Sequence, residues 1–163
     1  MDLQEMRISE VIQPSAIDLD LQGICSKDDV IACLAEKLDK AGLLVDKDLY
    51  IQSVYEREDM GSTYMGFDIA IPHGKSPGVR EAGIAFGRCK AGFEYISQND
   101  KANVKLVFLL AIPDRTSPDA YMAVLAKLAR LLVHEEFREA LMQATNYDDV
   151  IAAIIDCEQY LME

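Results

Sequence analysis

The sequence has few basic residues, few histidines and no long apolar run. Lysine and arginine together number 16 against 28 aspartates and glutamates, so the formal net charge is −12 at pH 7. Because nucleic-acid phosphates and anionic lipids repel a surface of that sign, neither is an expected partner. The longest apolar run, Leu106 to Ile112, has seven residues, whereas a membrane span needs roughly 20. The polar start MDLQEMRISE has no apolar signal core, which predicts a cytoplasmic protein.

The chain also lacks the motifs of metal sites and nucleotide-binding loops. Its four cysteines are scattered without a C-x-x-C pair, so we expect reduced thiols and no zinc site. The segment Gly74–Ser76 ends like a phosphate-binding loop, but Ile69 stands where the first glycine of that motif belongs. His134 begins a sequence like the helical zinc motif, but Arg138 replaces its second histidine. No metal and no cofactor are therefore predicted.

The organisation of the chain favours a single domain. Its 163 residues contain no internal repeat and no long linker, which predicts one domain over residues 1–163. Apolar and polar residues alternate over Ile17–Leu21, as in a half-buried strand. Ser26 is a candidate N-cap for a helix that ends at Gly42. A second helix is predicted from Asp46 to Glu58.

The middle of the chain predicts strands, and the last third predicts helices. Phe67–Ile71 alternates like a strand that ends in a turn at Pro72–Gly74, and Ala82–Cys89 has the composition of another strand. Val104–Ile112 is nearly all apolar, as in a central strand covered on both faces. The helices predicted after it begin at Ser117-Pro118 and span Glu135–Met142 and Tyr147–Leu161. This order of elements predicts a mixed sheet between helices.

The two histidines of the chain differ in their surroundings. His134 lies near the end of a predicted helix beside acidic residues, which is typical of a surface position. His73 follows a predicted strand, between a proline that fixes the chain and a glycine that leaves space beside the ring. Basic and hydroxyl side chains are frequent around it in this acidic sequence. These neighbours are Arg57, Ser62, Thr63, Lys75, Arg80 and Lys90.

A single histidine without a metal or cofactor can act as a general base or as a nucleophile that carries a phosphoryl group. A general base needs an orienting carboxylate, and Asp68 is the nearest candidate. A phosphoryl carrier needs mainly positive charges and N–H donors around the phosphoryl oxygens. A glycine-flanked turn with arginine and lysine nearby meets that requirement. On these residues alone, a structural and a functional interpretation of His73 both stay open.

The sequence around His73 resembles the core motif of a known family. The motif reads Arg57-Glu58-x-x-Gly61-Ser62-Thr63-x-x-Gly66-x-x-Ile69-Ala70-Ile71-Pro72-His73-Gly74-Lys75. It is similar to the motif of fructose/mannitol-type enzyme IIA domains of the bacterial phosphoenolpyruvate:sugar phosphotransferase system, and the likeness extends over nearly the whole chain. The resemblance implies a three-layer α/β/α sandwich with a mixed central sheet, in agreement with the predicted order of elements.

The resemblance also implies a phosphotransferase function. The small carrier HPr would phosphorylate His73, which would pass the group to a sugar-specific IIB component, with the membrane component IIC only an indirect partner. Arg57 would line the same site. Thr63, Gly74 and Lys75 would bind or support the phosphoryl group. The acidic net charge has two interpretations that both stay open, solubility and the attraction of carriers with basic faces.

One position departs from the pattern of the family. Members commonly carry a second histidine near the start of the helix after the central strand, and Tyr121 takes that place here. Its hydroxyl can donate a hydrogen bond but carries no positive charge near neutral pH. Two other functions therefore stay open, a nitrogen-type regulatory IIA that binds target proteins according to phosphorylation and a small-anion-binding module. Fructose, mannitol and related polyols are all possible substrates of the pathway.

Overall fold

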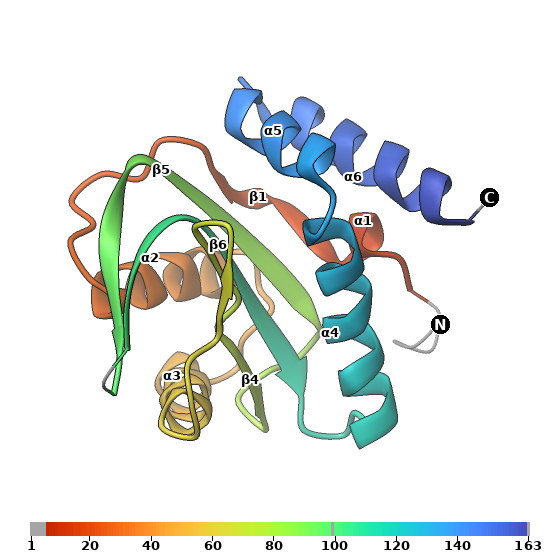
Figure 1. Ribbon diagram of the computed structural model, residues 1–163. Helices are drawn as coiled ribbons and strands as arrows, with labels where there is room; N and C mark the ends of the chain where they lie inside the picture. The colour runs from red at the N-terminus through yellow and green to blue at the C-terminus, as the bar shows by residue number, and fades with distance from the viewer. Residues whose placement is uncertain (1–5, 99, 163) are drawn as a thin grey trace.

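A mixed β-sheet lies between two layers of helices (Figure 1). The computed structural model describes residues 6–98 and 100–162. The helices are α1 (Ile8–Val11), α2 (Lys27–Lys40), α3 (Lys47–Glu58), α4 (Pro118–Leu132), α5 (Glu135–Gln143) and α6 (Tyr147–Met162). The strands are β1 (Ile12–Asp18), β2 (Tyr64–Gly66), β3 (Ile69–Ala70), β4 (His73–Ser76), β5 (Gly83–Ser97) and β6 (Asp100–Pro113). The predicted three-layer α/β/α sandwich with a mixed sheet is confirmed.

Strand β6 is the centre of the sheet. The order of strands is β1-β5-β6-β3-β2, and β4 also pairs with β6. β6 runs antiparallel to β5 and parallel to both β3 and β4. β1 joins β5 in parallel, while β2 and β3 form an antiparallel pair. From Leu106 to Ala111, β6 has strands on both sides, so the prediction of a central strand over Val104–Ile112 is confirmed.

The side chains of β6 alternate between two hydrophobic cores. Leu106, Phe108 and Leu110 pack with residues of α1, α4, α5 and α6. Val107, Leu109 and Ala111 pack with residues of α2 and α3. Successive side chains of a strand point to opposite faces, so a strand covered on both faces needs an uninterrupted apolar run. This requirement explains the composition of Val104–Ile112.

Three helices begin where local capping signals predict them. The side-chain oxygens of Ser26, Asp46 and Ser117 each accept a hydrogen bond from the backbone N–H three residues later. These bonds satisfy donors that the first helical turn leaves without partners. Gly42 follows α2 with φ of +82°, a conformation that suits glycine at the end of a helix. The predicted starts of α2, α3 and α4 are therefore confirmed.

The predicted strand over Ile17–Leu21 is displaced in the structure. The observed strand, β1, ends at Asp18, and the short helix α1 precedes it. Pro14 lies within β1, which is possible because β1 is at the edge of the sheet and pairs only with β5. Leu21 still touches the sheet through its backbone N–H, which donates to the carbonyl of Arg88.

The segment from Phe67 to Gly74 corrects two predictions. Phe67 and Asp68 have φ of 57° and 62°, so they form the two-residue turn between β2 and β3 and do not belong to a strand. The predicted turn at Pro72–Gly74 is also wrong. The carbonyl of Pro72 accepts from the N–H of Leu110, and β4 begins at His73. Proline does not interrupt this pairing, because only its carbonyl is used.

Strands β5 and β6 form a hairpin much longer than predicted. Their pairing runs from Gly83↔Ala111 to Ser97↔Asp100, with an irregularity between Arg88 and Phe93. The prediction of a strand over Ala82–Cys89 therefore covers only the first half of β5. Beyond the irregularity, buried and exposed residues alternate, and Tyr95 and Ser97 are among the buried ones. The second half of β5 thus places the side chain of Ser97 against Glu58, the last residue of α3.

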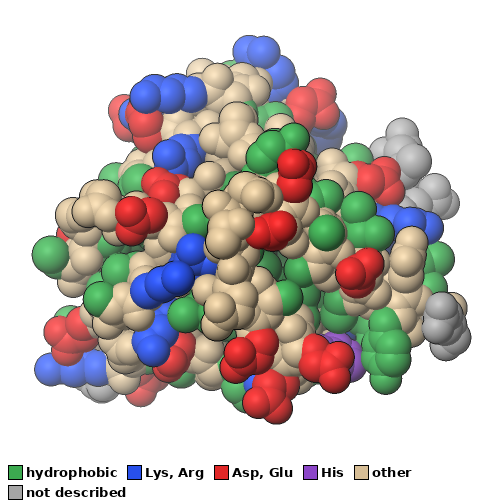
Figure 2. Space-filling model, turned by 90° about the horizontal axis from the view of Figure 1, so that it is seen from above, with side chains coloured by type: hydrophobic (Ala, Val, Ile, Leu, Met, Phe, Trp, Pro, Cys, Tyr) green, Lys and Arg blue, Asp and Glu red, His purple; other side chains and the backbone are tan. Residues whose placement is uncertain are grey.

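Figure 2 shows the face on which α5 and α6 lie, with charged side chains scattered among apolar and uncharged ones. Acidic side chains gather along the lower edge of that view, and basic side chains lie mainly on its left side and at its top. Among the described residues, no helix has the length and apolar character needed to cross a membrane. All four cysteines are free thiols.

Gly74 should be indispensable for packing α3 against β4. A Cβ atom there would overlap Ser53 Oγ and lie 3.0 Å from Val54 Cγ2. Ser53 would have to give up its 2.6 Å hydrogen bond to the carbonyl of Tyr50, and Val54 would have to move. We expect Gly74→Ala to lower the free energy of unfolding by about 1–3 kcal/mol, measured by urea denaturation.

The same substitution in a Ser53→Ala background provides the control. Removing Ser53 Oγ removes the nearest obstacle, so part of the lost stability should return. If Gly74→Ala leaves the free energy of unfolding unchanged, the packing of α3 against β4 does not require a residue without a side chain at position 74.

Candidate functional site

His73 is the first residue of β4 and pairs with Leu110 of β6. Its side chain is buried, with 5% of its surface exposed. The ring nitrogen Nδ1 lies 2.7 Å from the carbonyl oxygen of Ile71. Because a carbonyl oxygen only accepts hydrogen bonds, Nδ1 must carry the hydrogen, and Nε2 of the neutral ring keeps a free electron pair. The fold therefore fixes which nitrogen can act as a nucleophile.

The surroundings of His73 favour its neutral form. Burial lowers the pKa of His73, and the positive charge of Arg57 lowers it further. The hydrogen bond to Ile71 and the charge of Glu58 act in the opposite direction but do not outweigh burial. A pKa below the ordinary value means that the imidazole is uncharged at neutral pH, which a nucleophile requires.

Tyr121 of α4 lies against the edge of the His73 ring. The two ring centroids are 5.8 Å apart, and the ring planes are inclined by 82°. Burial raises the pKa of the Tyr121 hydroxyl to about 12, although the charge of Arg57 opposes this effect. The hydroxyl therefore keeps its proton at neutral pH and can donate a hydrogen bond. His73 and Tyr121 are 48 positions apart in the sequence, and the fold brings their rings into contact, as the family resemblance implies.

Arg57 extends from the last turn of α3. Its Nη1 atom donates a 2.9 Å hydrogen bond to the carbonyl of Gly61 in the following loop. Its positive charge lowers the pKa of both His73 and Tyr121, so its electrostatic field acts on both rings. A guanidinium group has five N–H donors, so several remain to face an anion after the bond to Gly61.

Gly74 and Lys75 follow His73 in β4 and have different surroundings. Gly74 faces α3, where Ser53 and Val54 fill the space beside it. The sequence prediction that this glycine leaves space beside the imidazole is therefore wrong, because the space belongs to α3. Lys75 is half-buried, and as the second residue after His73 it projects from the same face of the strand.

Thr63 lies in the loop before β2, and its side chain is buried. Its hydroxyl donates to the carboxylate of Glu58. A direct hydrogen bond from Thr63 to a phosphoryl group, as the family resemblance implies, would require this bond to break. Ser62 accepts a hydrogen bond from the backbone N–H of Tyr64 through its side-chain oxygen. In the described structure, both hydroxyls therefore organise the loop.

The structure separates several other residues from His73. Asp68 lies in the turn between β2 and β3 and pairs with Lys105 at 4.0 Å, so the carbonyl of Ile71 orients the ring instead. Lys90 lies in the irregular middle part of β5, beyond the Arg88↔Leu106 pair, whereas His73 lies beside Leu110. The basic residues near His73 in sequence therefore do not all surround it in space.

His134 is not part of this site. It is the N-cap residue of α5 and lies two residues after the end of α4, so its predicted position near the end of a helix is confirmed. Its ring makes an edge contact with the ring of Tyr160 of α6, with centroids 5.7 Å apart. The sequence indicated a surface position, whereas the structure shows a half-buried ring packed against Tyr160.

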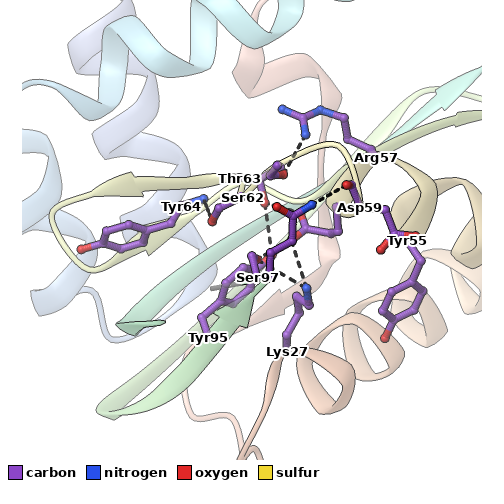
Figure 3. A network of polar contacts seen from close by, with 12 residues as sticks. Lys27, Tyr55, Arg57, Asp59, Ser62, Thr63, Tyr64, Tyr95 and Ser97 are labelled. Carbon is purple, nitrogen blue, oxygen red and sulfur yellow. Dashed lines mark hydrogen bonds and ion pairs between the residues drawn. The ribbon is translucent and has the colours of Figure 1, made fainter. Parts of the chain in front are cut away.

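Sequence reasoning missed a buried polar network beside the site (Figure 3). Its centre is the carboxylate of Glu58, which is 2% exposed. A signal for it exists in the sequence, because Tyr50, Val54 and Glu58 share one helical face at spacings of four residues. A charged residue in line with a buried apolar face needs partners, and these come from distant segments.

His73, Arg57 and Tyr121 have the chemistry that a tetrahedral anion requires. Nε2 of His73 supplies an electron pair, Arg57 supplies positive charge, and Tyr121 supplies an O–H donor. Positioning and charge neutralisation are the main requirements of phosphoryl transfer. The arrangement is therefore suited to hold a phosphoryl group on the histidine.

The comparisons with known proteins agree with this chemistry. Residues 10–157 match the family described as "Phosphoenolpyruvate-dependent sugar phosphotransferase system, EIIA 2". A fructose-specific EIIABC component of this system from Bacillus subtilis (strain 168) is 36% identical over 149 residues, which are 91% of this chain and 23% of that protein. A fructose-specific EIIA component from Haloferax volcanii is 32% identical over 134 residues, which are 80% of this chain and 86% of that protein.

A solved structure supports the same assignment. The crystal structure of the nitrogen regulatory protein IIA-Ntr from Neisseria meningitidis has a TM-score of 0.75 and 28% sequence identity. The match covers 90% of this chain and 98% of that chain. The chain therefore belongs to the EIIA 2 family of the phosphoenolpyruvate-dependent sugar phosphotransferase system, whose members transfer phosphoryl groups by way of a histidine.

Proposed function

We propose that this chain is a phosphocarrier in which His73 accepts a phosphoryl group from phospho-HPr and passes it to a IIB component. The protein works in the cytoplasm as one domain over residues 1–163, and the membrane component IIC takes part only after IIB. The observation that carries the proposal is the fixed tautomer of His73, which leaves Nε2 unprotonated in a buried ring beside Arg57.

Both transfer steps proceed without moving a proton to or from His73. In the first step, the electron pair of Nε2 forms a bond to phosphorus while the bond from phosphorus to the leaving atom of phospho-HPr breaks and its electrons stay on that atom. Nδ1 keeps its hydrogen, which the carbonyl of Ile71 accepts in a hydrogen bond. In the second step, the nucleophile of the IIB component attacks phosphorus, and the P–N bond electrons return to Nε2. The neutral ring is thereby restored in its original tautomer.

Arg57 and Tyr121 stabilise the charge on the phosphoryl oxygens. The guanidinium group offers positive charge and N–H donors, and the phenol offers an O–H donor that burial keeps protonated. Lys75 adds positive charge on the face of β4 from which His73 projects. Neither metal nor cofactor is needed for this step, because the nucleophile is already uncharged and the oxyanions meet fixed donors.

The names of the relatives favour a sugar-transport function. Both curated relatives described above are fructose-specific components, and the one from Bacillus subtilis is an EIIABC component of which this chain spans 23%. A B component is accordingly the proposed acceptor, and a sugar or polyol of the fructose/mannitol class is the proposed final substrate. The likeness to IIA-Ntr supports a regulatory function as the alternative. Transfer of label to a IIB component would favour transport, whereas binding of another target without such transfer would favour regulation.

We expect His73 to be the residue that is labelled. The protein, incubated with phosphoenolpyruvate, enzyme I and HPr, should gain one acid-labile phosphate, and His73→Ala should gain none. Nitrogen-15 and phosphorus-31 NMR should place the phosphorus on Nε2, because Nδ1 is hydrogen-bonded to Ile71. His134→Ala is the control and should be labelled like the wild type. Label on His73→Ala, or phosphorus on Nδ1, would contradict the assignment.

The pKa of His73 should lie below its ordinary value of 6.5. The unfolded chain then binds a proton near pH 6.5 while the folded chain does not, so stability falls as pH decreases below that value. Above pH 6.5 both states are neutral, and this contribution no longer changes. Titration of the His73 ring by NMR measures the pKa directly. Urea unfolding of His73→Gln between neutral and mildly acidic pH should show a weaker loss of stability than the wild type.

The hydroxyl of Tyr121 should contribute to transfer. Tyr121→Phe keeps the ring against His73 but removes the O–H donor, so the rate of phosphorylation by phospho-HPr should fall about tenfold. Tyr147→Phe, at the exposed start of α6, is the matched control and should react at the rate of the wild type. An unchanged rate for Tyr121→Phe would assign Tyr121 to packing alone.

A further inference from the structure

The buried carboxylate of Glu58 receives hydrogen bonds from three segments of the chain (Figure 3). Thr63, in the loop before β2, donates its hydroxyl hydrogen to Oε2. Ser97, at the end of β5, donates to Oε1 at 3.2 Å. Lys27, at the start of α2, approaches Oε1 at 3.4 Å and balances the negative charge. The carboxylate therefore joins α2, α3, β5 and the loop after α3.

The direction of these hydrogen bonds follows from the number of hydrogens. The hydroxyl of Thr63 has a single hydrogen, and Glu58 accepts it. The hydroxyl of Tyr95 lies 3.1 Å from Thr63 Oγ1, so Tyr95 must be the donor of that bond. Burial and the nearby charge of Glu58 raise the pKa of Tyr95, which keeps this donor protonated. The bonds thus point from Tyr95 through Thr63 to the carboxylate.

Two further connections lead from this network to the phosphoryl site. Towards Arg57, the N–H of Gly61 donates to the carbonyl of Glu58, and the carbonyl of Gly61 accepts from Arg57 Nη1. Towards His73, the carbonyl of Thr63 accepts from the N–H of Ile71 at 3.0 Å, and the carbonyl of Ile71 holds His73 Nδ1. Glu58 is thus connected to the guanidinium and to the imidazole by hydrogen bonds of a single loop.

The hairpin holds the same loop from outside. Gln98, just beyond β5, donates a 2.6 Å hydrogen bond from Nε2 to the carbonyl of Asp59. Residues 59–63 are therefore fixed at their start by Gln98, in their middle by Arg57 and at their end by Glu58. A short loop held at three points has few alternative conformations, so the groups it positions are well defined.

We propose that Glu58 is a positioning residue that sets the location of Arg57 relative to His73 for phosphoryl transfer. The proposal rests on the function proposed above. Glu58 itself does not touch the phosphoryl group; it acts through Thr63 and the loop. An apolar side chain would fill the same space without the cost of burying a charge, but it would accept no hydrogen bond from Thr63.

Thr63→Val tests the proposal because valine has the shape of threonine without the hydroxyl. Under single-turnover conditions at saturating phospho-HPr, the rate of phosphorylation should fall about tenfold. The phospho-HPr concentration that gives half of the maximal rate should stay unchanged, because Thr63 is buried and lies outside any docking surface. Thr63→Ser restores the hydroxyl and should restore the rate to within about twofold of the wild type.

The pKa of His73, measured by NMR titration, is the second readout. Arg57 lowers this pKa in the wild type, so a guanidinium that moves away in Thr63→Val must let it rise. The other charged and titratable groups on the side of the ring are Glu58, Tyr121 and Lys75. The substitution replaces none of them, and the loss of the Thr63 hydrogen bond leaves Glu58 with Ser97 and Lys27 as partners. A loss of stability alone would not shift the pKa of the folded protein.

Two other variants separate positioning from general destabilisation. Ile154→Val removes one buried methyl group from α6 on the other face of the sheet, and should lower stability without changing the transfer rate or the pKa. Tyr95→Phe removes only the donor to Thr63; it should slow transfer about threefold and serves if Thr63→Val does not fold.

The outcomes distinguish this proposal from the function on which it rests. A wild-type protein that gains no label would overturn the proposed phosphocarrier function. A labelled wild type with an equally fast Thr63→Val and an unchanged His73 pKa would overturn only the role of Glu58. A Thr63→Ser variant as slow as Thr63→Val, or an Ile154→Val variant as slow as either, would likewise assign the network to stability.

Discussion

The hydrogen bond between Nδ1 of His73 and the carbonyl of Ile71 is the interaction on which the site depends. It assigns the ring hydrogen to one nitrogen and leaves the other free, which no surface histidine with water as its partner would do reliably. The bond forms because the chain passes alongside β6 in an extended conformation, with Pro72 accepting from Leu110 before β4 begins. A tighter turn at this point would have turned the carbonyl of Ile71 away from the ring.

The layers of the sandwich bring the remaining groups to this nitrogen. Successive residues of β4 face opposite layers, so His73 meets Tyr121 of α4 while Gly74 meets α3. The absence of a side chain at Gly74 lets α3 pack against the strand, and the last turn of α3 carries Arg57. The position of the guanidinium therefore depends on the absence of a side chain at Gly74. In β4, His73 is the candidate nucleophile, and the next residue, Gly74, allows α3 to pack against the strand.

Sequence patterns predicted the features that depend on residues close together in the chain, and they missed the contacts between distant segments. The N-cap at Ser117 depends on residues within one turn, so the start of its helix was predicted correctly. The turn at Phe67–Asp68 was predicted as strand, because residues in a two-residue hairpin turn do not interrupt alternation. Gly74 was interpreted as space beside the ring, since only the structure shows the helix that occupies it. The partners of Glu58 could not be predicted because Ser97 lies 39 positions away and joins it only through the long hairpin.

Electrostatics explains why such a site suits delivery by a protein rather than by free phosphate. The chain has a net charge of −12, so a phosphate anion approaching from solution is repelled at long range. Near the ring, the charge of Arg57 favours an anion, but burial limits access, and His73 is only 5% exposed. A donor protein with a basic face is attracted by the same surface that repels the anion. Such a donor carries the phosphoryl group as a covalently bound group. The attraction between the donor's basic face and the acidic surface then outweighs the repulsion of the phosphoryl anion. The negative surface and the half-buried Arg57 therefore act at different distances, and both favour a donor protein with a basic face.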